Sequence, residues 1–229
     1  ISQTEEKLAQ EEENYITLYR TRKTLEKMRQ NPYFGRVDFK DEDFSSVDQI
    51  YIGIATLMDE NEEFLIYDWR APICSIFYDY EPGKVQYRSP EGIVRGEMLL
   101  KRQYKFVDGK LLYMFNSSVK VDDDILQEIL SQSTDEKMKI IVNTIQKEQN
   151  KIIRDEDYRV LAVQGSAGSG KTSIALHRAA YLLYKYRDKI TSRNILIFSP
   201  NDVFNDYISD VLPELGEEKL RQTTFTRFI

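Results

Sequence analysis

One eight-residue segment constrains the fold of this chain more than any other. The pattern G-x-x-x-x-G-K-[S/T] is matched at every defined position by Gly165-Ser166-Ala167-Gly168-Ser169-Gly170-Lys171-Thr172. An apolar run over Arg159–Gln164 leads into the segment, and a helical pattern over Lys171–Tyr186 follows it. A glycine-rich turn between a strand and a helix aims backbone N–H groups and the positive end of the helix dipole at phosphate oxygens. The segment therefore predicts a phosphate-binding loop in an α/β nucleotide-binding fold.

Two side chains of this loop carry the predicted chemistry. Lys171 is predicted to contact the β- and γ-phosphates as a mobile charge, and the Thr172 hydroxyl to ligate Mg²⁺. Lys171 and Thr172 are therefore the candidate catalytic residues, and Thr172 is the candidate metal ligand. The predicted cofactor-binding residues of the loop are Gly165, Ser166, Ala167, Gly168, Ser169, Gly170, Lys171 and Thr172.

Residues 1–31 are predicted to form one helical arm. No Gly or Pro precedes Pro32, and apolar residues such as Leu8, Tyr15, Leu18 and Leu25 recur at helical spacings. Acidic residues gather early and basic residues late, which suits the helix dipole. The narrow apolar stripe beside a dense polar face favours half of an antiparallel coiled coil; a helix packed on its own domain is the alternative.

Residues 32–121 change to short β-type runs separated by turn residues. The predicted strands are Gly35–Phe39, Ile50–Leu57, Phe64–Tyr67, Ile73–Tyr80, Lys84–Tyr87, Ile93–Phe106 and Leu111–Phe115. Asp108-Gly109 between the last two is a strong type I′ hairpin signal. Closely spaced strands predict a small antiparallel domain, a meander or a barrel. Its many aromatic side chains are expected in the core, with a stacking platform for single-stranded nucleic acid as the alternative.

Residues 122–229 alternate between helical and strand patterns. Asp122-Asp123-Asp124 are typical of a helix start, with a metal site as the sharper alternative. The predicted elements that follow are a helix over Thr134–Arg154, a strand over Arg159–Gln164, the helix after the loop, a strand over Asn194–Phe198 and a helix over Val203–Leu212. This order indicates a parallel sheet. The predicted fold class is thus α/β: part of a parallel P-loop sheet, preceded by a small antiparallel β-domain and a long N-terminal helix.

Composition excludes several classes of protein. The chain has 38 acidic and 32 basic residues, a net charge of −6 that argues against nucleic-acid binding by the whole surface. Its apolar runs are far shorter than the ~20 residues of a membrane span, and we see no secretory signal. The chain has one cysteine, Cys74, and one histidine, His177, which argues against disulfides and zinc sites. Cys74 is expected to be a buried strand residue, and His177 a packing or surface residue. We expect a cytoplasmic protein with no membrane partner, and we make no prediction of an oligomer from the sequence.

The loop and its surroundings resemble the first motor domain of superfamily 1 helicases of the UvrD and Rep type. Residues 177–182, His-Arg-Ala-Ala-Tyr-Leu, and residues 145–149, Ile-Gln-Lys-Glu-Gln, are similar to motifs of that group. The resemblance implies a RecA-like domain that binds ATP with Mg²⁺ and contacts the adenine edge through Gln149. Ser173 belongs to the implied site but stands where that group has an Arg that stacks on adenine. The adenine contact is therefore expected to be weaker or supplied elsewhere.

Two segments after the loop resemble motifs Ia and Ib of that group, which contact single-stranded DNA. They are residues 195–201 and Thr224-Phe225-Thr226. The nucleic-acid-binding residues that this resemblance implies are Phe198, Asn201, Thr224, Phe225 and Thr226.

Four segments narrow the resemblance to HelD, the helicase-IV-like bacterial family. They are residues 31–36, residues 51–53, Asp68-Trp69-Arg70-Ala71-Pro72 and residues 211–217. HelD-type proteins bind RNA polymerase and use an ATP-driven motor to help strip nucleic acid from it. The resemblance implies core RNA polymerase and a DNA or RNA single strand as partners. It also makes residues 1–31 the returning helix of a coiled-coil arm that enters the secondary channel of the polymerase.

An acidic pair that holds Mg²⁺ and orients the attacking water is missing from the predicted strands. Residues 64–68 fit an apolar run that ends in Asp, but they precede the loop and are more simply the end of a strand. The chain begins with Ile rather than Met, which suggests a fragment, and the acidic pair is expected on strands beyond residues 195–198. We therefore expect the N-terminal part of a longer motor, which hydrolyses little ATP alone. A DNA-unwinding repair helicase and a nucleotide-binding interaction module without turnover are the alternatives to a polymerase-associated motor.

Overall fold

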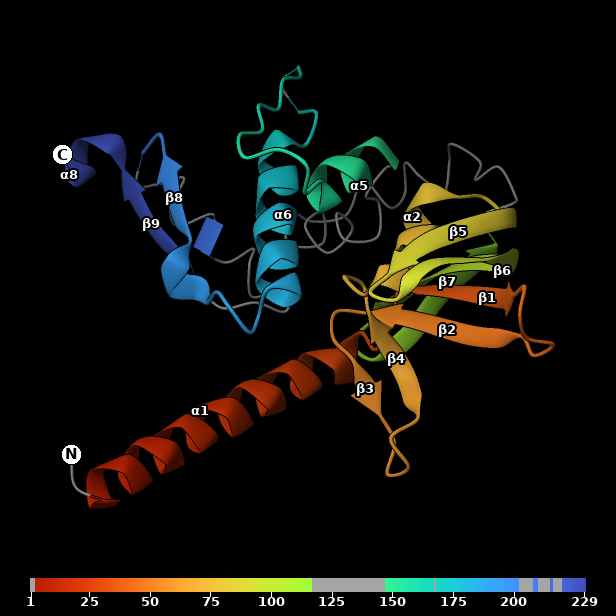
Figure 1. The fold of residues 1–229 in the computed structure, drawn as a ribbon, viewed down its shortest axis with the longest axis horizontal. Coiled ribbons are helices and arrows are strands. Elements are labelled where there is room, and N and C mark those ends of the chain that lie inside the picture. Colours follow the sequence, from red (N-terminus) through yellow and green to blue (C-terminus); the bar gives the residue numbers. More distant parts are fainter. Residues whose placement is uncertain (1–2, 117–146, 167, 202–207, 210–214, 216–219) are drawn as a thin grey trace.

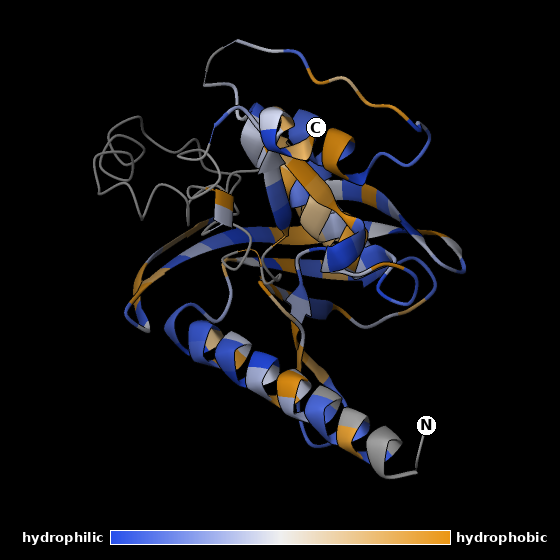
Figure 2. Cartoon of the chain, turned by 90° about the vertical axis from the view of Figure 1, so that its left-hand side faces the viewer, coloured by the Kyte–Doolittle hydropathy of each residue, from blue (hydrophilic) through white to orange (hydrophobic). Residues whose placement is uncertain are grey.

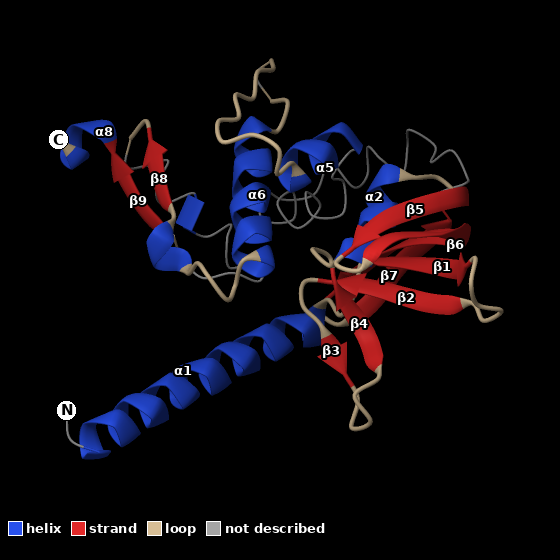
Figure 3. Ribbon diagram, in the orientation of Figure 1, coloured by secondary structure: helices blue, strands red, loops and turns tan. Residues whose placement is uncertain are grey.

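The computed structural model describes residues 3–116, 147–166, 168–201, 208–209, 215 and 220–229. It is a mixed α/β chain in which a long helix leaves a mainly antiparallel sheet, with further helices and a small parallel sheet beyond (Figures 1 and 3). The elements are α1 (Gln3–Gln30), β1 (Gly35–Asp41), β2 (Asp48–Gly53), β3 (Leu57–Met58), β4 (Phe64–Asp68), the 3-10 turn η1 (Pro72–Cys74), α2 (Ser75–Asp79), β5 (Gly83–Ser89), β6 (Gly92–Val107), β7 (Lys110–Asn116), α5 (Lys147–Arg154), α6 (Lys171–Lys185), the 3-10 turn η2 (Ser192–Asn194), β8 (Leu196–Ser199), β9 (Arg221–Thr224) and α8 (Phe225–Phe228).

The large sheet is built around the long strand β6. Its strand order is β3-β4-β2-β1-β6-β5, and β7 also pairs with β6. Glu97 of β6 pairs with β1 and β5, whereas Arg102 pairs with β1 and β7. Because a strand has two edges, β5 and β7 follow one another along the edge of β6 opposite β1. The predicted antiparallel domain is confirmed in outline, but β2 and β4 pair in parallel, so the sheet is no simple meander.

One continuous cluster of buried apolar side chains joins the sheet to α5 and α6. It contains Trp69 and Phe77 from the β-domain together with Ile153 of α5 and Ile174 of α6. The expectation that the aromatic residues form a core is confirmed for Trp69, Phe77 and Tyr78, whereas Phe64 is half exposed.

The predicted strand over Ile73–Tyr80 is wrong, because these residues form η1 and α2. Pro72 occupies the first turn of η1, a position where a missing N–H costs nothing. Cys74, Ile76, Phe77 and Tyr78 are all buried, so the run lacks the alternation of a strand with one wet face. Periodicity alone does not separate a short apolar run of this kind from a buried helix.

The predicted strand over Arg159–Gln164 is also not formed. The Val160 side chain is 85% exposed, and no described strand pairs with these residues, whereas β8 pairs in parallel with β9. A strand without a neighbour leaves its backbone N–H and C=O groups unpaired, so water competes for them. Most of the predicted helix over Val203–Leu212 lies outside the described residues, although residues 208 and 209 are helical. Asp122–Asp124 and most of Thr134–Arg154 also lie outside them.

The N-terminal helix is confirmed, and it projects from the sheet with its apolar stripe exposed (Figures 1 and 2). Leu18 is 69% exposed, whereas Met28 in the last turn is buried. The alternative of a helix packed along its own domain does not describe α1. The coiled-coil arm stays a prediction.

The hairpin between β6 and β7 caps the end of α1. Asp108 and Gly109 have φ values of 50° and 75°, the two positive values that a type I′ turn requires, so the predicted hairpin is confirmed. The Gly109 N–H donates to the Gln30 carbonyl oxygen over 3.0 Å. The last carbonyl groups of a helix have no partner inside the helix, so this contact fixes where the arm leaves the sheet.

Replacement of Gly109 by Ala is expected to loosen the last turn of α1. A Cβ there would lie 3.2 Å from the Arg29 carbonyl oxygen, and the positive φ adds about 1–2 kcal/mol of strain. We expect faster amide hydrogen exchange over Lys27–Gln30. Gly92→Ala is the control, since it also has a positive φ but no atom within 4 Å of the added carbon. Equal exchange over Lys27–Gln30 in both variants would show that the hairpin does not hold the arm.

Candidate nucleotide-binding site

The glycine-rich loop ends at the first turn of α6 with its lysine folded back over it. The Lys171 Nζ donates to the carbonyl oxygens of Gly165 over 2.9 Å and Ser166 over 2.6 Å. Gly170 caps the helix with a φ of 81°, a left-handed conformation that favours glycine. Ser169 N–H donates to the Ser166 carbonyl oxygen over 3.3 Å, which tightens the turn. Ala167 lies outside the described residues.

Helix α6 holds the loop through its apolar face. Leu176, Ala180 and Leu183 are buried in the core, four and three positions apart, which is the spacing of one helix face. The Ile174 N–H donates to the Gly170 carbonyl oxygen over 2.8 Å, so the helix ladder begins at the end of the loop. Partly buried Lys171, Thr172 and Ser173 occupy this first turn, where unpaired N–H groups and the positive dipole end favour an anion.

Gln149 and Gly170 lie side by side although 21 positions separate their numbers in the chain. A Cβ built on Gly170 would be 3.1 Å from the Gln149 Nε2 atom. The fold thus brings the implied adenine-reading side chain of α5 against the phosphate loop. A carboxamide offers both a donor and an acceptor, which suits the edge of a base. Ser173 lies in the same helical turn and has no ring that stacks on adenine.

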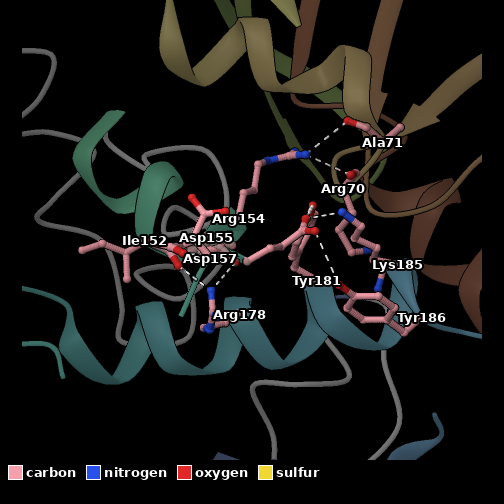
Figure 4. A network of polar contacts seen from close by, with 12 residues as sticks. Arg70, Ala71, Ile152, Arg154, Asp155, Asp157, Arg178, Tyr181, Lys185 and Tyr186 are labelled. Atoms are coloured by element: carbon pink, nitrogen blue, oxygen red, sulfur yellow. Dashed lines mark hydrogen bonds and ion pairs between the residues drawn. The ribbon is translucent and has the colours of Figure 1, made fainter. Parts of the chain in front are cut away.

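Helix α5 is tied to the β-domain by polar contacts (Figure 4). Arg154 donates to the backbone carbonyls of residues 69–71, and Asn150 donates to Asp79 over 2.8 Å. Sequence reasoning missed both residues. The available signal was the spacing of four between Asn150 and Arg154, which places both on one face of a helix.

The segment after β4 receives these contacts. Asp68 and Arg70 form a buried ion pair, with 2.6 Å between Oδ2 and Nη2, and the Trp69 side chain between them is fully buried. Trp69 and Arg70 therefore pack inside the β-domain and stabilise this segment. Asp68 ends β4 and is paired with Arg70, in agreement with its interpretation as a strand end.

A family model described as DNA helicase IV HelD, N-terminal domain, matches residues 2–134, more than half of the chain. The chain belongs to the HelD family. A search of curated proteins found no match. The matched residues hold α1 and the whole seven-stranded sheet and stop before the phosphate loop. Membership of the HelD family therefore rests on the arm and the β-domain.

His177 is a packing residue of this HelD-family chain, as expected. Its ring lies 5.4 Å from the Trp69 ring in an edge-to-face arrangement, so α6 contacts the segment after β4 directly. Its Nδ1 atom lies 2.7 Å from the Ser173 carbonyl oxygen. Because a carbonyl oxygen only accepts, Nδ1 carries the proton, and the buried Nε2 atom has no hydrogen-bond partner in the described structure. Burial lowers the pKa of His177 from 6.5 to about 4, so the ring is neutral near pH 7.

Acidification is expected to destabilise the fold through His177. The unfolded chain binds the imidazole proton with the higher pKa, so stability falls as pH drops below 6.5 toward 4. From about pH 7.5 to about pH 5, the free energy of unfolding is expected to fall by about 2 kcal/mol through this group. Urea titrations at both pH values measure the fall. His177→Asn retains a donor and removes the titration, so an equally large fall in that variant would contradict the assignment.

The thiol of the buried Cys74 is expected to react slowly. Burial raises the pKa of the Cys74 thiol well above its usual range, so the thiolate is scarce at neutral pH. The prediction of a buried residue is confirmed, although Cys74 lies in η1 rather than in a strand.

The implied nucleic-acid residues gather at the carboxyl ends of β8 and β9. Phe198 and Phe225 are 49% and 68% exposed, with 6.4 Å between their ring centres. Phe228, which sequence reasoning missed, lies 5.0 Å from Phe198 and is equally open to solvent. Thr224 ends β9 opposite Ser199, Asn201 follows β8, and Thr226 lies in α8.

The described residues contain neither a candidate metal-binding cluster nor a candidate membrane-spanning helix. These residues contain no group of three or more His, Cys, Asp or Glu side chains arranged to hold a metal ion. None of their helices combines the length and the apolar character that crossing a membrane requires.

Proposed function

We propose that this HelD-family chain binds ATP with Mg²⁺ at residues 165–172 and serves an ATP-dependent, helicase-like motor. The observation that carries the proposal is the Lys171 ammonium at the first turn of α6, held by two loop carbonyls beside the Gln149 amide. Lys171 would exchange these carbonyls for phosphate oxygens, which bind an ammonium more strongly because they are charged. Nothing lies within 4 Å of a Cβ built on Gly168, so the loop is open at this point.

Each residue of the loop would then have a separate task. Backbone N–H groups and the start of α6 would bind the phosphates, and Lys171 would neutralise their charge. Thr172 would hold Mg²⁺, which bridges phosphate oxygens when bound and offsets their negative charge. Gln149 would read the adenine edge. We further propose that residues 122–229 build part of a RecA-like parallel sheet, of which β8 and β9 are two neighbouring strands.

Binding of ATP by the purified chain tests this proposal. A fluorescent ATP analogue is titrated with Mg²⁺ present, and again after the metal is chelated. Saturable binding that weakens without Mg²⁺ and that unlabelled ATP competes away is the expected result. Absence of saturable binding up to millimolar nucleotide would overturn the proposal.

The proposed partners are core RNA polymerase and a DNA or RNA single strand, which places the protein in the cytoplasm. Membership of the HelD family supports the first partner, as does the exposed stripe of the projecting helix α1. The open aromatic cluster of Phe198, Phe225 and Phe228 supports the second, because bases stack on exposed aromatic rings.

Two binding experiments separate polymerase association from DNA unwinding as the main task. A stable complex with core RNA polymerase in the absence of DNA is expected by size-exclusion chromatography. A repair helicase would instead bind single-stranded oligonucleotides first, with affinity that falls steeply as salt rises. Strong oligonucleotide binding without any polymerase complex would reject the polymerase-associated motor in favour of a DNA-unwinding helicase.

A further inference from the structure

We propose that Arg154 is a positioning residue for adenine recognition: through Arg154 and Asn150, the β-domain holds Gln149 against the phosphate loop. The β-domain is then a structural part of the adenine side of the site, in addition to any partner it binds. This inference rests on the proposed nucleotide-binding function and assigns part of that function to residues outside the loop.

Both terminal nitrogens of the Arg154 guanidinium group donate hydrogen bonds to the segment after β4. Its Nη2 atom donates to the Trp69 carbonyl oxygen over 2.8 Å, and Nη1 to those of Arg70 over 3.0 Å and Ala71 over 3.4 Å. Figure 4 shows the side chain reaching from α5 to the carbonyls of Arg70 and Ala71. The planar group presents several donors in a fixed geometry, so this contact sets orientation as well as distance.

Asn150 supplies a second anchor, one residue after Gln149. Its buried side chain accepts from Arg154 Nε over 3.0 Å and donates to the Asp79 carboxylate over 2.8 Å. Asp79 is the last residue of α2, so the second contact also ends in the β-domain. Gln149 and Arg154 lie about 7.5 Å apart along one short helix, so a tilt at one end displaces the other.

The surface that receives Arg154 is rigid. Asp68 accepts from Arg70 Nε over 2.8 Å and from the Arg70 backbone N–H over 2.9 Å, while the Trp69 ring is buried. The carbonyls of residues 69–71 follow the end of β4, and that of Ala71 also accepts from the Cys74 backbone N–H over 3.0 Å. Arg154 therefore binds acceptors that are already in place.

Helix α6 also contacts α5, at the last turn of that helix. Arg178 donates to the carbonyl oxygens of Ile152 over 2.8 Å and Ile153 over 3.3 Å, which are among the last of α5. Just beyond α5, Glu156 accepts from the Tyr181 hydroxyl over 3.0 Å and pairs with Lys185. Helix α5 therefore has hydrogen bonds to the β-domain on one side and to α6, the helix that carries Lys171, on the other. Since Ser173 provides no stacking ring, discrimination of the base depends on the position of Gln149.

The test compares ligands that do and do not carry a base. Affinities of the chain for ATP, GTP and inorganic tripolyphosphate are measured with Mg²⁺ for wild type and Arg154→Met, which keeps an unbranched apolar stem. We expect the preference for ATP over GTP to fall about tenfold, as for one lost base contact. Affinity for tripolyphosphate is expected to stay within about twofold of wild type, because the loop is untouched. Lys151→Met, on the exposed side of α5, should change neither quantity.

A second pair of variants keeps the test independent of how well Arg154→Met folds. Asp79→Ala removes the other anchor from the β-domain side, and we expect the ATP preference to fall about threefold. Asp79→Asn retains an acceptor for Asn150 and should retain the preference.

Two results would overturn the inference. One is an unchanged ATP preference in both Arg154→Met and Asp79→Ala; the other is an equal loss for all three ligands, which indicates a general role in stability. If wild type bound none of the ligands, the proposed function itself would fail, and this outcome is distinct from both.

Discussion

Lys171→Ala abolishes high-affinity nucleotide binding, with a loss of about 100-fold or more, if the loop works as proposed. The substitution removes the one ammonium at the start of α6 that contacts the loop in the described structure. A charge-assisted contact contributes about 1.5–3 kcal/mol, and a phosphate chain offers more than one acceptor to the same group. Competition titration with a fluorescent ATP analogue measures the loss.

The fold should tolerate this change. The two hydrogen bonds of Lys171 are made to exposed carbonyl groups, which water satisfies when the side chain is gone. We therefore expect the urea midpoint of Lys171→Ala to match wild type, and Lys151→Ala, which removes an exposed lysine of α5, serves as a control. In the complete motor, equal ATP-driven output from wild type and Lys171→Ala would rule out the proposed role.

Trp69→Ala is expected to cost about 3–5 kcal/mol of unfolding free energy. The side chain is fully buried in the cluster that joins the sheet to α6, and it packs against His177 with 5.4 Å between the rings. The cavity would open beside the Asp68–Arg70 ion pair, whose partners are also buried. Unfolding in urea followed by circular dichroism measures the loss.

Phe64→Ala is the matched control for this prediction. Phe64 is an aromatic residue of the same strand region but is half exposed, so its removal should cost about 1 kcal/mol or less. A cost for Trp69→Ala as small as that for Phe64→Ala would mean that the junction between the sheet and α6 contributes little to stability.

Elements with strong local signals could be predicted from the sequence. The arm α1 lacks any breaker before Pro32, and Asp108-Gly109 defines its hairpin through two positive φ values. The errors fall where tertiary context decides. Residues 73–80 are buried on several sides and fold as η1 and α2, and residues 159–164 form no ladder. The parallel pairing of β2 with β4 also depends on contacts that no local pattern encodes.

The residues of the candidate site also fall into two groups, those with a local sequence signal and those that depend on tertiary contacts. A phosphate loop is a contiguous motif, so its residues and the helix that follows it could be named from the sequence. Gln149 could be named because its motif resembles one in known motors. Arg154 and Asn150 escaped prediction because their partners, residues 69–71 and Asp79, lie more than 70 positions earlier in the chain. Only the folded arrangement brings these groups together.

Trp69 also provides an optical probe of this region. It is the single tryptophan of the chain, so all indole emission comes from the point where the sheet, α5 and α6 meet. A fully buried indole is shielded from water and should emit at short wavelength. A red shift on addition of nucleotide would report that this junction opens, and an unchanged spectrum would report that it stays closed. No label is needed to watch the β-domain respond to the loop.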